Sequence, residues 1–577
     1  MEVMTAGPAP AGPAEATGAG RGWLIPLIVL IVGMFMSVLD TTIVNVAIPT
    51  MQRDFGASSD DIEWIVTAYT LALGVVVPLC GWLGDRLGAT RVYLVSLIGF
   101  SAASALCGLA WDLNSMIVFR ILQAIPGGVI PVVSMTMLYV IVPREQMGSA
   151  MGIYGLGIIF GPAIGPTLGG YLVEYVDWRL IFFINAPVGV AGAIAGMLLL
   201  PKLGATSKRP MDWWGFLTIA FGLFALLLAC SEGQSWGWTG YRVLVLITAG
   251  VLSLALFVVI EMEVDEPLLD LRVFAIWPFV NSLLLISILS IGLNSILFYL
   301  PLFMQSTQGI QPLRTGLILM PEALSMALLM PIAGKLYDKF GPRWPAVFGL
   351  AIACWGGFLL CGINPDMTQG EVILWTVIRA VGNALALMPI MTAGLSAIPP
   401  EFTSSGSPVN NIAQRVSGSL GLAAMTVLAT SQQHQLMSDR SALVTRADAV
   451  PQLQQAADRG TSGLYGFYLQ LQGQATGRAY SNVFLICAWL SVLGLGLAFM
   501  MKKPAQDEAA AQPVAPEAAP AGTELTPARG APAEAGPDSG TGADVRSGTG
   551  AGAGSDTTAP GGPARELAGG PARSGGR

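Results

Sequence analysis

A series of long apolar stretches is the feature that most constrains how this chain can fold. Each stretch is long enough to cross about 30 Å of hydrocarbon. Charged residues make up only 11% of the 577 residues, whereas soluble domains carry about 25%. Fourteen such spans are predicted, at residues 24–48, 61–83, 91–111, 115–142, 147–173, 180–200, 213–231, 241–262, 277–303, 315–336, 344–363, 370–398, 405–430 and 481–501. The sequence therefore predicts an all-α polytopic membrane protein.

A charged, glycine-containing loop occurs twice, about 250 residues apart, after the second and the tenth span. Its two copies contain Gly81, Asp85, Arg86, Gly88 and Arg91, and Gly334, Asp338, Lys339, Gly341 and Arg343. Such a repeat indicates two matched six-span halves, with spans seven and eight inserted between them. Glycines allow close helix contact and the aspartates can pair with basic neighbours, so both loops are predicted to gate the inner side. A plain solvated turn is the alternative.

The predicted domain boundaries follow from the two matched halves and from the composition of the chain ends. They are a disordered segment at 1–22, a six-helix bundle at 23–203, two inserted helices at 204–270, a second bundle at 271–503 with a long outer loop at 431–480, and a disordered Ala/Gly/Pro-rich tail at 504–577. Thirteen basic residues lie near the membrane on one side and four in short loops on the other. Lys and Arg favour the cytoplasmic side, so both termini are predicted to be cytoplasmic, in a protein of the cell membrane.

Charges inside the spans are candidates for function, because each costs about 2.5–3.5 kcal/mol on insertion scales. They are Asp40, Arg120, Glu322, Arg379 and Arg415. Asp40 is the candidate proton carrier, since burial favours the neutral acid and a guanidinium such as Arg120 favours the ionised one; a purely structural partner is the alternative. Glu322 is interpreted as a second protonatable or cation-binding acid, or else as a glutamate that reaches the membrane interface.

Polar residues at helical spacing suggest an aqueous cleft between the halves. Arg120 and Gln123 share one helix face, and Asn411, Gln414 and Arg415 share another. Asp40 and Arg120 are expected to face this cleft. The predicted cavity residues are Asn45, Gln123, Asn411, Gln414 and Arg415.

The fifth span is rich in glycine and proline. Its repeated motif consists of Gly161, Pro162, Gly165, Pro166, Gly169 and Gly170. Proline kinks helices and spaced glycines allow tight crossing, so a pliable helix is predicted at the interface between the halves. Generic small-residue packing is the alternative.

Several function classes find no support in the sequence. A Walker loop and a spaced Cys/His ligand set are both missing, which argues against direct use of ATP, against a metal and against any other cofactor. No block of like charge indicates a nucleic-acid partner, and no enzyme constellation is found. An ion gradient across the lipid bilayer is then the expected energy source.

Five motifs in order resemble the major facilitator superfamily, and within it the fourteen-span drug:proton antiporters of the EmrB/QacA type. They lie at residues 39–49, 81–91, 120–128, 161–170 and 177–189, and the resemblance covers about residues 23–502. It implies two six-helix bundles plus two extra central helices, and a protein that exports hydrophobic small molecules in exchange for protons. In this interpretation Asp40 exchanges protons and substrate, Arg120 tunes it, and Asp85 and Asp338 gate the inner side.

The resemblance leaves alternatives open. Ala89 and Thr90 stand where the family often has basic residues, so a weaker latch is expected in the first loop. A dedicated exporter of one self-made metabolite, such as an antibiotic, is the second hypothesis. A non-transporting receptor or scaffold and an inward symporter are less favoured.

Overall fold

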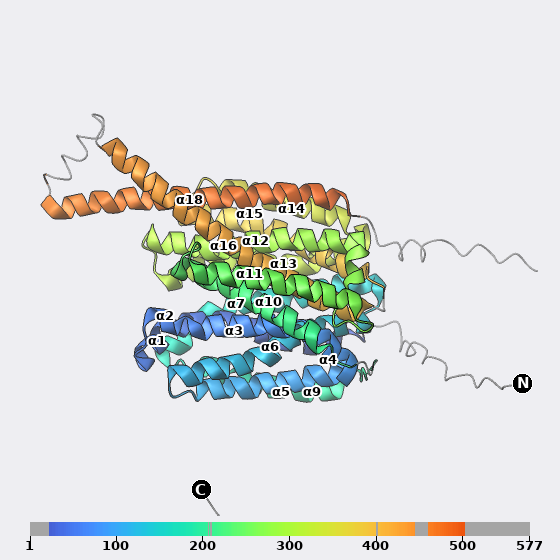
Figure 1. Cartoon of the computed structure of the whole chain (residues 1–577). Coiled ribbons are helices and arrows are strands. Elements are labelled where there is room, and N and C mark those ends of the chain that lie inside the picture. The colour runs from blue at the N-terminus through green and yellow to red at the C-terminus, as the bar shows by residue number, and fades with distance from the viewer. Residues whose placement is uncertain are drawn as a thin grey trace, which may run out of the picture. The chain divides into compact units, whose positions relative to one another are not determined.

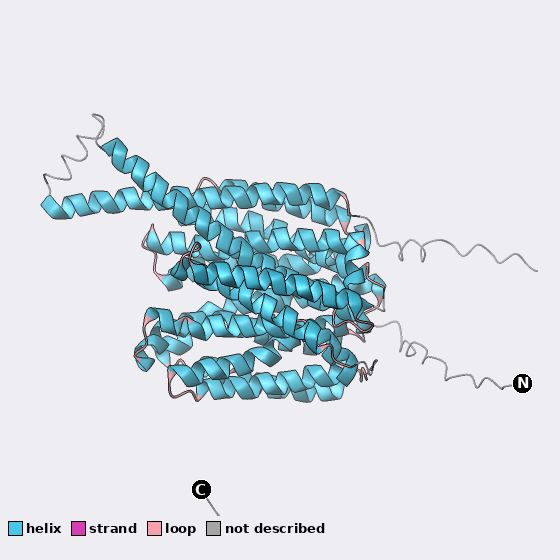
Figure 2. Ribbon diagram, in the orientation of Figure 1, coloured by secondary structure: helices cyan, strands magenta, loops and turns pink. Residues whose placement is uncertain are grey.

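The computed structural model describes residues 22–205, 207, 210–399, 402–444, 458 and 460–501. The predicted tail and nearly all of the predicted N-terminal segment lie outside these residues. The described residues form helices and connecting loops without any strand (Figure 2). Thirteen helices are long and apolar enough to cross a membrane, and a bent pair can form one more. The predicted all-α, fourteen-span fold is thereby confirmed.

The helices fall into two halves and an insertion (Figure 1). The first half contains α1 (Leu24–Phe55), α3 (Trp64–Val76), α4 (Leu79–Leu87), α5 (Ala89–Gly108), α6 (Leu113–Ile141), α7 (Met147–Tyr175) and α9 (Asn185–Leu199), with the short α2 (Ser59–Ile62) and α8 (Leu180–Phe183). The insertion contains α10 (Trp213–Trp236) and α11 (Tyr241–Glu263). The second half contains α12 (Trp277–Ser306), α13 (Pro312–Phe340), α14 (Arg343–Leu360), α15 (Gln369–Ser396), α16 (Thr403–Val444) and α18 (Gly460–Phe499). Helix α10 contacts both α3 and α16, so the insertion touches each half.

The second predicted span is bent rather than straight. Helices α3 and α4 meet at an angle of 57°, and Pro78 occupies the position just before α4. Proline has no backbone N–H and clashes with the preceding turn, so it interrupts the helix at this point.

Both copies of the charged loop turn through a glycine with positive φ. The φ angle is 89° at Gly88, which follows α4, and 74° at Gly341, which follows α13. Residues with a side chain rarely adopt this conformation. The end of the bundle that carries Gly88 and Gly341 is called the hinge end below.

The predicted long loop at residues 431–480 is largely helical. Helix α16 continues to Val444 and α18 already begins at Gly460, and both project beyond the other helices on the left of Figure 1. The prediction of a loop was wrong for the described residues. Polar residues end an apolar span but need not end a helix, and Gln and Ser are compatible with a helix. Residues 445–457 lie outside the described part.

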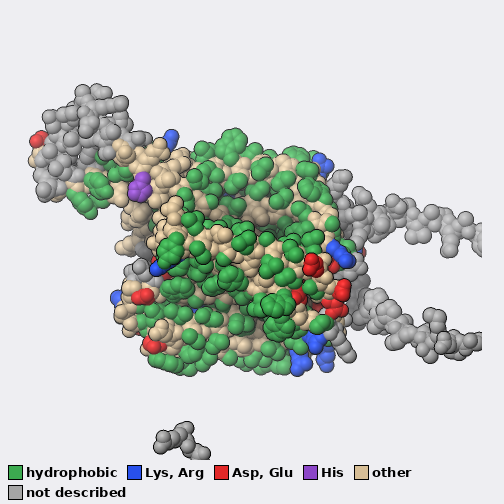
Figure 3. Space-filling view, viewed as in Figure 1, with side chains coloured by type: hydrophobic (Ala, Val, Ile, Leu, Met, Phe, Trp, Pro, Cys, Tyr) green, Lys and Arg blue, Asp and Glu red, His purple; other side chains and the backbone are tan. Residues whose placement is uncertain are grey.

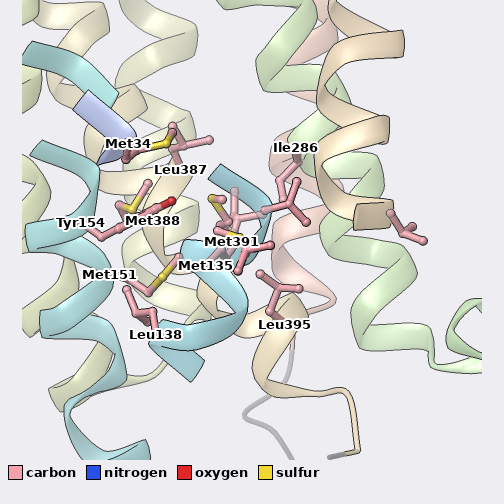
Figure 4. Packing of buried hydrophobic residues seen from close by; sticks show 14 of the residues in the cluster. Met34, Met135, Leu138, Met151, Tyr154, Ile286, Leu387, Met388, Met391 and Leu395 are labelled. Carbon is pink, nitrogen blue, oxygen red and sulfur yellow. The ribbon is translucent and has the colours of Figure 1, made fainter. Parts of the chain in front are cut away.

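Methionine-rich packing joins the two halves. Met135 of α6, Met151 of α7 and Met388 and Met391 of α15 are buried and belong to one cluster (Figure 4). Thioether side chains are flexible and adapt to irregular gaps. This contact between the halves is therefore built from side chains that can repack when helices shift.

Candidate functional site

Asp40 and Arg120 form a fully buried ion pair inside the first half. Nη1 of Arg120 on α6 lies 2.6 Å from Oδ2 of Asp40 on α1. The exposed fractions of the two side chains are 0% for Asp40 and 1% for Arg120. The expectation that both face an aqueous cleft is wrong for this structure, because neighbouring helices cover them completely.

Two amides complete the surroundings of the carboxylate. Nε2 of Gln123 donates to Oδ1 of Asp40 at 2.8 Å, and Nδ2 of Asn185, at the start of α9, donates to the same oxygen at 3.1 Å. Gln123 also accepts from Nη1 of Arg120 at 2.8 Å. Asp40 thus receives hydrogen bonds from three side chains on two helices, which satisfies a charge that would otherwise be costly to bury. Gln123 is buried in this network rather than lining a cavity.

Tyr69 of α3 covers the other side of the guanidinium. The ring centroid of Tyr69 lies 3.8 Å from Cζ of Arg120, a cation–π distance. The Tyr69 hydroxyl is buried and has no hydrogen-bond partner in the described part of the chain. Arg415 of α16 lies near enough to Tyr69 for the two side chains to influence one another electrostatically.

The remaining predicted cavity residues are not gathered around Asp40. Asn45 is exposed, whereas Asn411, Gln414 and Arg415 are half-buried on α16. Nδ2 of Asn411 donates to the carbonyl of Ser407 within its own helix, at 3.0 Å. Arg415 forms no ion pair with any described residue, so it remains a candidate contact for a polar group of a substrate.

Glu322 forms a second intramembrane ion pair, with Arg379. The pair links α13 to α15, and the exposed fractions are 17% for Glu322 and 6% for Arg379. This position does not fit the alternative in which Glu322 reaches the membrane interface. Among the described residues, each half therefore contains a carboxylate paired with an arginine inside its helices, fully buried at Asp40 and partly buried at Glu322.

The second charged loop joins the two halves through Asp338. The Asp338 carboxylate, on α13, accepts from the backbone N–H of Gly148 at 2.8 Å and of Ser149 at 2.9 Å. Both donors lie in the first turn of α7, where free N–H groups and the helix dipole favour an anion. None of the ion pairs among the described residues joins Asp338 to a basic neighbour, although the sequence allowed such a pair.

Glycines allow the close approach at the hinge end. A Cβ atom on Gly334 would collide with the backbone of Gly148, so α13 and α7 cross in direct backbone contact. In the first loop, a Cβ on Gly81 would lie 2.5 Å from the Ser404 carbonyl oxygen of α16. Each loop thus meets the start of a helix in the opposite half.

The first charged loop also forms hydrogen bonds with the chain that follows its own half. Oγ1 of Thr90 donates to the carbonyl of Pro201 at 2.6 Å and accepts from the N–H of Leu203 at 3.0 Å. The Asp85 carbonyl accepts from Ser207, and Arg86 stacks on Trp82. Thr90 therefore binds the chain that follows α9.

The glycines of α7 serve two different contacts. Gly148, Gly152 and Gly155 face the second half, whereas a Cβ on Gly161 would lie 3.0 Å from the backbone nitrogen of Leu39 on α1. Gly165 and Gly169 also face α1, Gly170 has no neighbour within 4 Å, and Pro162 is half-buried and Pro166 exposed. Helix α7 thus lies between α13 of the second half and α1, as expected of a helix at the interface, and its repeated Gly-Pro motif packs on the side of the helix that carries Asp40.

Sequence reasoning missed two members of the buried network. Asn185 was visible only as part of the motif at residues 177–189, and Tyr69 carries no charge to mark it inside an apolar span. A polar amide at the start of a span was the available signal for Asn185. No comparable signal marks Tyr69, since its role depends on which helix lies next to α6.

These features define a class of protein. Two matched helical halves, buried charges at the core of each, and a clamp between the halves are typical of a two-bundle secondary transporter. The chain belongs to the Major Facilitator Superfamily, whose family model matches residues 30–422. Fold and family indicate a multi-pass membrane transporter.

Known relatives and structures agree with this assignment. The chain is 30% identical to the tetracenomycin C resistance and export protein of Streptomyces glaucescens, over 83% of this chain and 89% of the relative. It is 30% identical to the multidrug resistance protein B homolog of Mycobacterium tuberculosis, over 70% and 76%. The structure of the proton:xylose symporter XylE bound to 6-bromo-6-deoxy-D-glucose matches with a TM-score of 0.53 at 14% identity, over 81% of this chain and 95% of XylE, which supports the fold alone.

Proposed function

We propose that this protein exports amphipathic, hydrophobic small molecules in exchange for protons, by alternating access between its two halves. The observation that carries the proposal is the Asp40–Arg120 pair, a carboxylate enclosed at the centre of one half. Binding a proton to Asp40 removes the charge that holds Arg120, so protonation and helix arrangement are coupled. Glu322, paired with Arg379, is a candidate second proton carrier.

The relatives support the export direction. One is named for resistance to and export of tetracenomycin C and another for multidrug resistance. Multidrug efflux is therefore the first candidate. A dedicated exporter of a single compound is the second, favoured by the relative named for one compound. Growth inhibition by a broad panel of hydrophobic compounds, in cells with and without the gene, distinguishes a wide from a narrow substrate range.

The hinge end provides the gate in this proposal. Asp338 holds the first turn of α7, and Gly334 lies against Gly148. Opening toward the cytoplasm requires these contacts to break while the halves rotate apart. The state described here is then the one closed to the cytoplasm.

Transport by Asp40→Asn protein tests the coupling. Asparagine keeps the size of the side chain but cannot carry a proton. In proteoliposomes with an imposed pH gradient and no ATP, wild-type protein should accumulate substrate against its gradient, whereas Asp40→Asn should not. Downhill exchange of substrate by the variant shows that binding and folding survive. Normal uphill transport by Asp40→Asn would assign coupling elsewhere, with Glu322→Gln as the next variant.

Cysteine labelling tests the orientation. The hinge end is assigned to the cytoplasm because basic residues concentrate there. In a background without native cysteines, a cysteine at Asn364, exposed at the opposite end, should react with an impermeant maleimide applied to intact cells. A cysteine at Lys335, exposed near the hinge end, should react only after the cells are opened. The reverse pattern contradicts the orientation.

A further inference from the structure

A cavity of about 710 Å³ lies at the hinge end, beside the inserted helices. It is bounded by α4, the segment before α10, the end of α11, residues 264–272 and the start of α16. Seven of its lining residues are acidic and two are arginines. In Figure 3 acidic side chains gather at this end of the molecule. One of the two arginines, Arg272, is 82% exposed and lies 4.0 Å from Asp270.

Glu261 is the unusual member of this lining. It is 5% exposed, and its Oε2 has no hydrogen-bond partner in the described chain. Its Oε1 accepts a long bond, 3.5 Å, from the N–H of Leu269. A buried carboxylate with an unused oxygen is costly unless it binds a proton or a positive group comes to it.

Asp212 brings a second unused oxygen to the same place. Its Oδ1 accepts from the N–H of Gly215 at 2.9 Å and so begins α10, whereas its Oδ2 is buried without a described partner. A Cβ on Gly215 would touch Oδ2 of Asp212 and lie 3.0 Å from Oε1 of Glu261. Two carboxylates from α11 and from the start of α10 therefore converge.

The chemistry of the cavity favours an organic cation over a metal ion. No set of three or more His, Cys, Asp or Glu within the described ranges is placed to hold a metal. The same cavity has an apolar side that includes Trp82, Leu268 and Phe402. Its volume lies in the range of about 300–1,000 Å³ that is usual for small-molecule pockets.

We propose that this cavity binds amphipathic organic cations, with the cationic head at Glu261 and Asp212 and the apolar body against Trp82 and Phe402. The inference deepens the proposed export function by giving it a substrate class and a binding position on the hinge side. It does not involve Asp40, which lies in the core of the first half. A cation held here sits next to the loop that contains Asp85, where the insertion meets the gate.

Equilibrium binding tests the site without requiring transport. The full chain in lipid nanodiscs is titrated with tetraphenylphosphonium, and with neutral triphenylphosphine oxide for comparison. Wild-type protein should prefer the cation. The double variant Asp212→Asn/Glu261→Gln should bind it about tenfold or more weakly, because charge-assisted contacts are lost, while binding of the neutral compound should change little. Asp366→Asn, at the opposite end of the bundle, makes a matched exposed-carboxylate control and should bind like wild type.

A second readout locates the bound cation. Met262 lines the cavity and is 76% exposed, so a cysteine there, in a background without native cysteines, should react with a maleimide. Tetraphenylphosphonium should slow this reaction at the concentration at which it binds, and not in the double variant. The proposal is overturned if the double variant binds tetraphenylphosphonium with unchanged affinity, or if the cation binds without protecting the cysteine at 262. It is also overturned if magnesium chloride displaces the cation more strongly than sodium chloride of equal ionic strength. If Asp40→Asn protein loses coupled transport but still binds tetraphenylphosphonium at this cavity, the coupling proposal and the binding proposal are tested independently of each other.

Discussion

Arg120 of α6 donates to Asp40 of α1 across 2.6 Å, and neither side chain reaches the surface. Two helices of the first half are thereby joined through opposite charges that water does not reach. Removing one partner of such a pair is expected to cost more than removing both, because a lone buried charge remains.

We expect Arg120→Ala to lower the free energy of unfolding by about 3–5 kcal/mol, the usual cost of breaking a buried pair. Adding Asp40→Asn should recover part of this loss, since the double variant leaves no unpaired carboxylate. Denaturant unfolding of the purified variants in detergent measures the two values and their coupling. Equal stability of Arg120→Ala with and without Asp40→Asn would contradict the pairing. All of these variants should lose uphill transport.

Asn185 is expected to be a positioning residue for Asp40. Its amide donates to Asp40 at 3.1 Å and to the hydroxyl of Ser104 at 3.1 Å. Asn185→Ala removes one hydrogen bond to a charged group, so uphill transport should fall by about tenfold or more. The pH profile of transport should also change shape, which simple loss of protein would not cause. Asn364→Ala, an exposed asparagine far from the site, should leave both rate and pH profile intact.

The contact between α7 and α1 should tolerate no added side chain at Gly161. Gly161→Ala places a methyl group against Val38 and the backbone of Leu39, next to Asp40. Overpacking of this kind costs about 1–3 kcal/mol, so both stability and transport should fall. Gly170→Ala is the matched control in the same helix, because a Cβ there would meet no described atom within 4 Å apart from its chain neighbours and its own helix backbone. Thermal unfolding and transport assays of the two variants should differ clearly; equal behaviour would argue against a tight crossing at Gly161.

The clamp at Asp338 should bias the halves toward closure at the hinge end. Asp338→Ala removes the acceptor for the N–H groups of Gly148 and Ser149. Loss of a helix-capping acceptor corresponds to a shift of roughly 2- to 30-fold in the equilibrium. Spin labels on α7 and α13 near this end should then report a larger population of long distances. Lys339→Ala removes an exposed charge one residue away and should leave the distances unchanged.

Spacing and charge in the sequence predicted much of the fold but less of the site. Apolar length predicted the number of spans, and the repeated loop predicted the two matched halves. The pairing of Asp40 with Arg120 could be anticipated because isolated charges in spans need partners. Their complete burial could not, since it depends on how α3 and α9 cover them.

Other features depend on which helix lies beside which. The glycine stripe around Gly161 was evident, but its partner, α1, could not be read from spacing. Pro78 was a visible signal for the bend between α3 and α4, although an apolar count alone joins the two helices. The acidic cavity draws residues from α10, α11 and the loop after it, and no local pattern indicates that Asp212 and Glu261 meet.

The length of α16 has a mechanical consequence. Its 42 residues correspond to about 60 Å of continuous helix, roughly twice the thickness of the hydrocarbon core. A rod of this length acts as a lever, since tilting of the second half displaces its distant tip more than its base. His434 is an exposed position on this projecting part of α16 (Figure 3). A fluorophore attached near it would report the tilting of the second half from a site outside the hydrocarbon core.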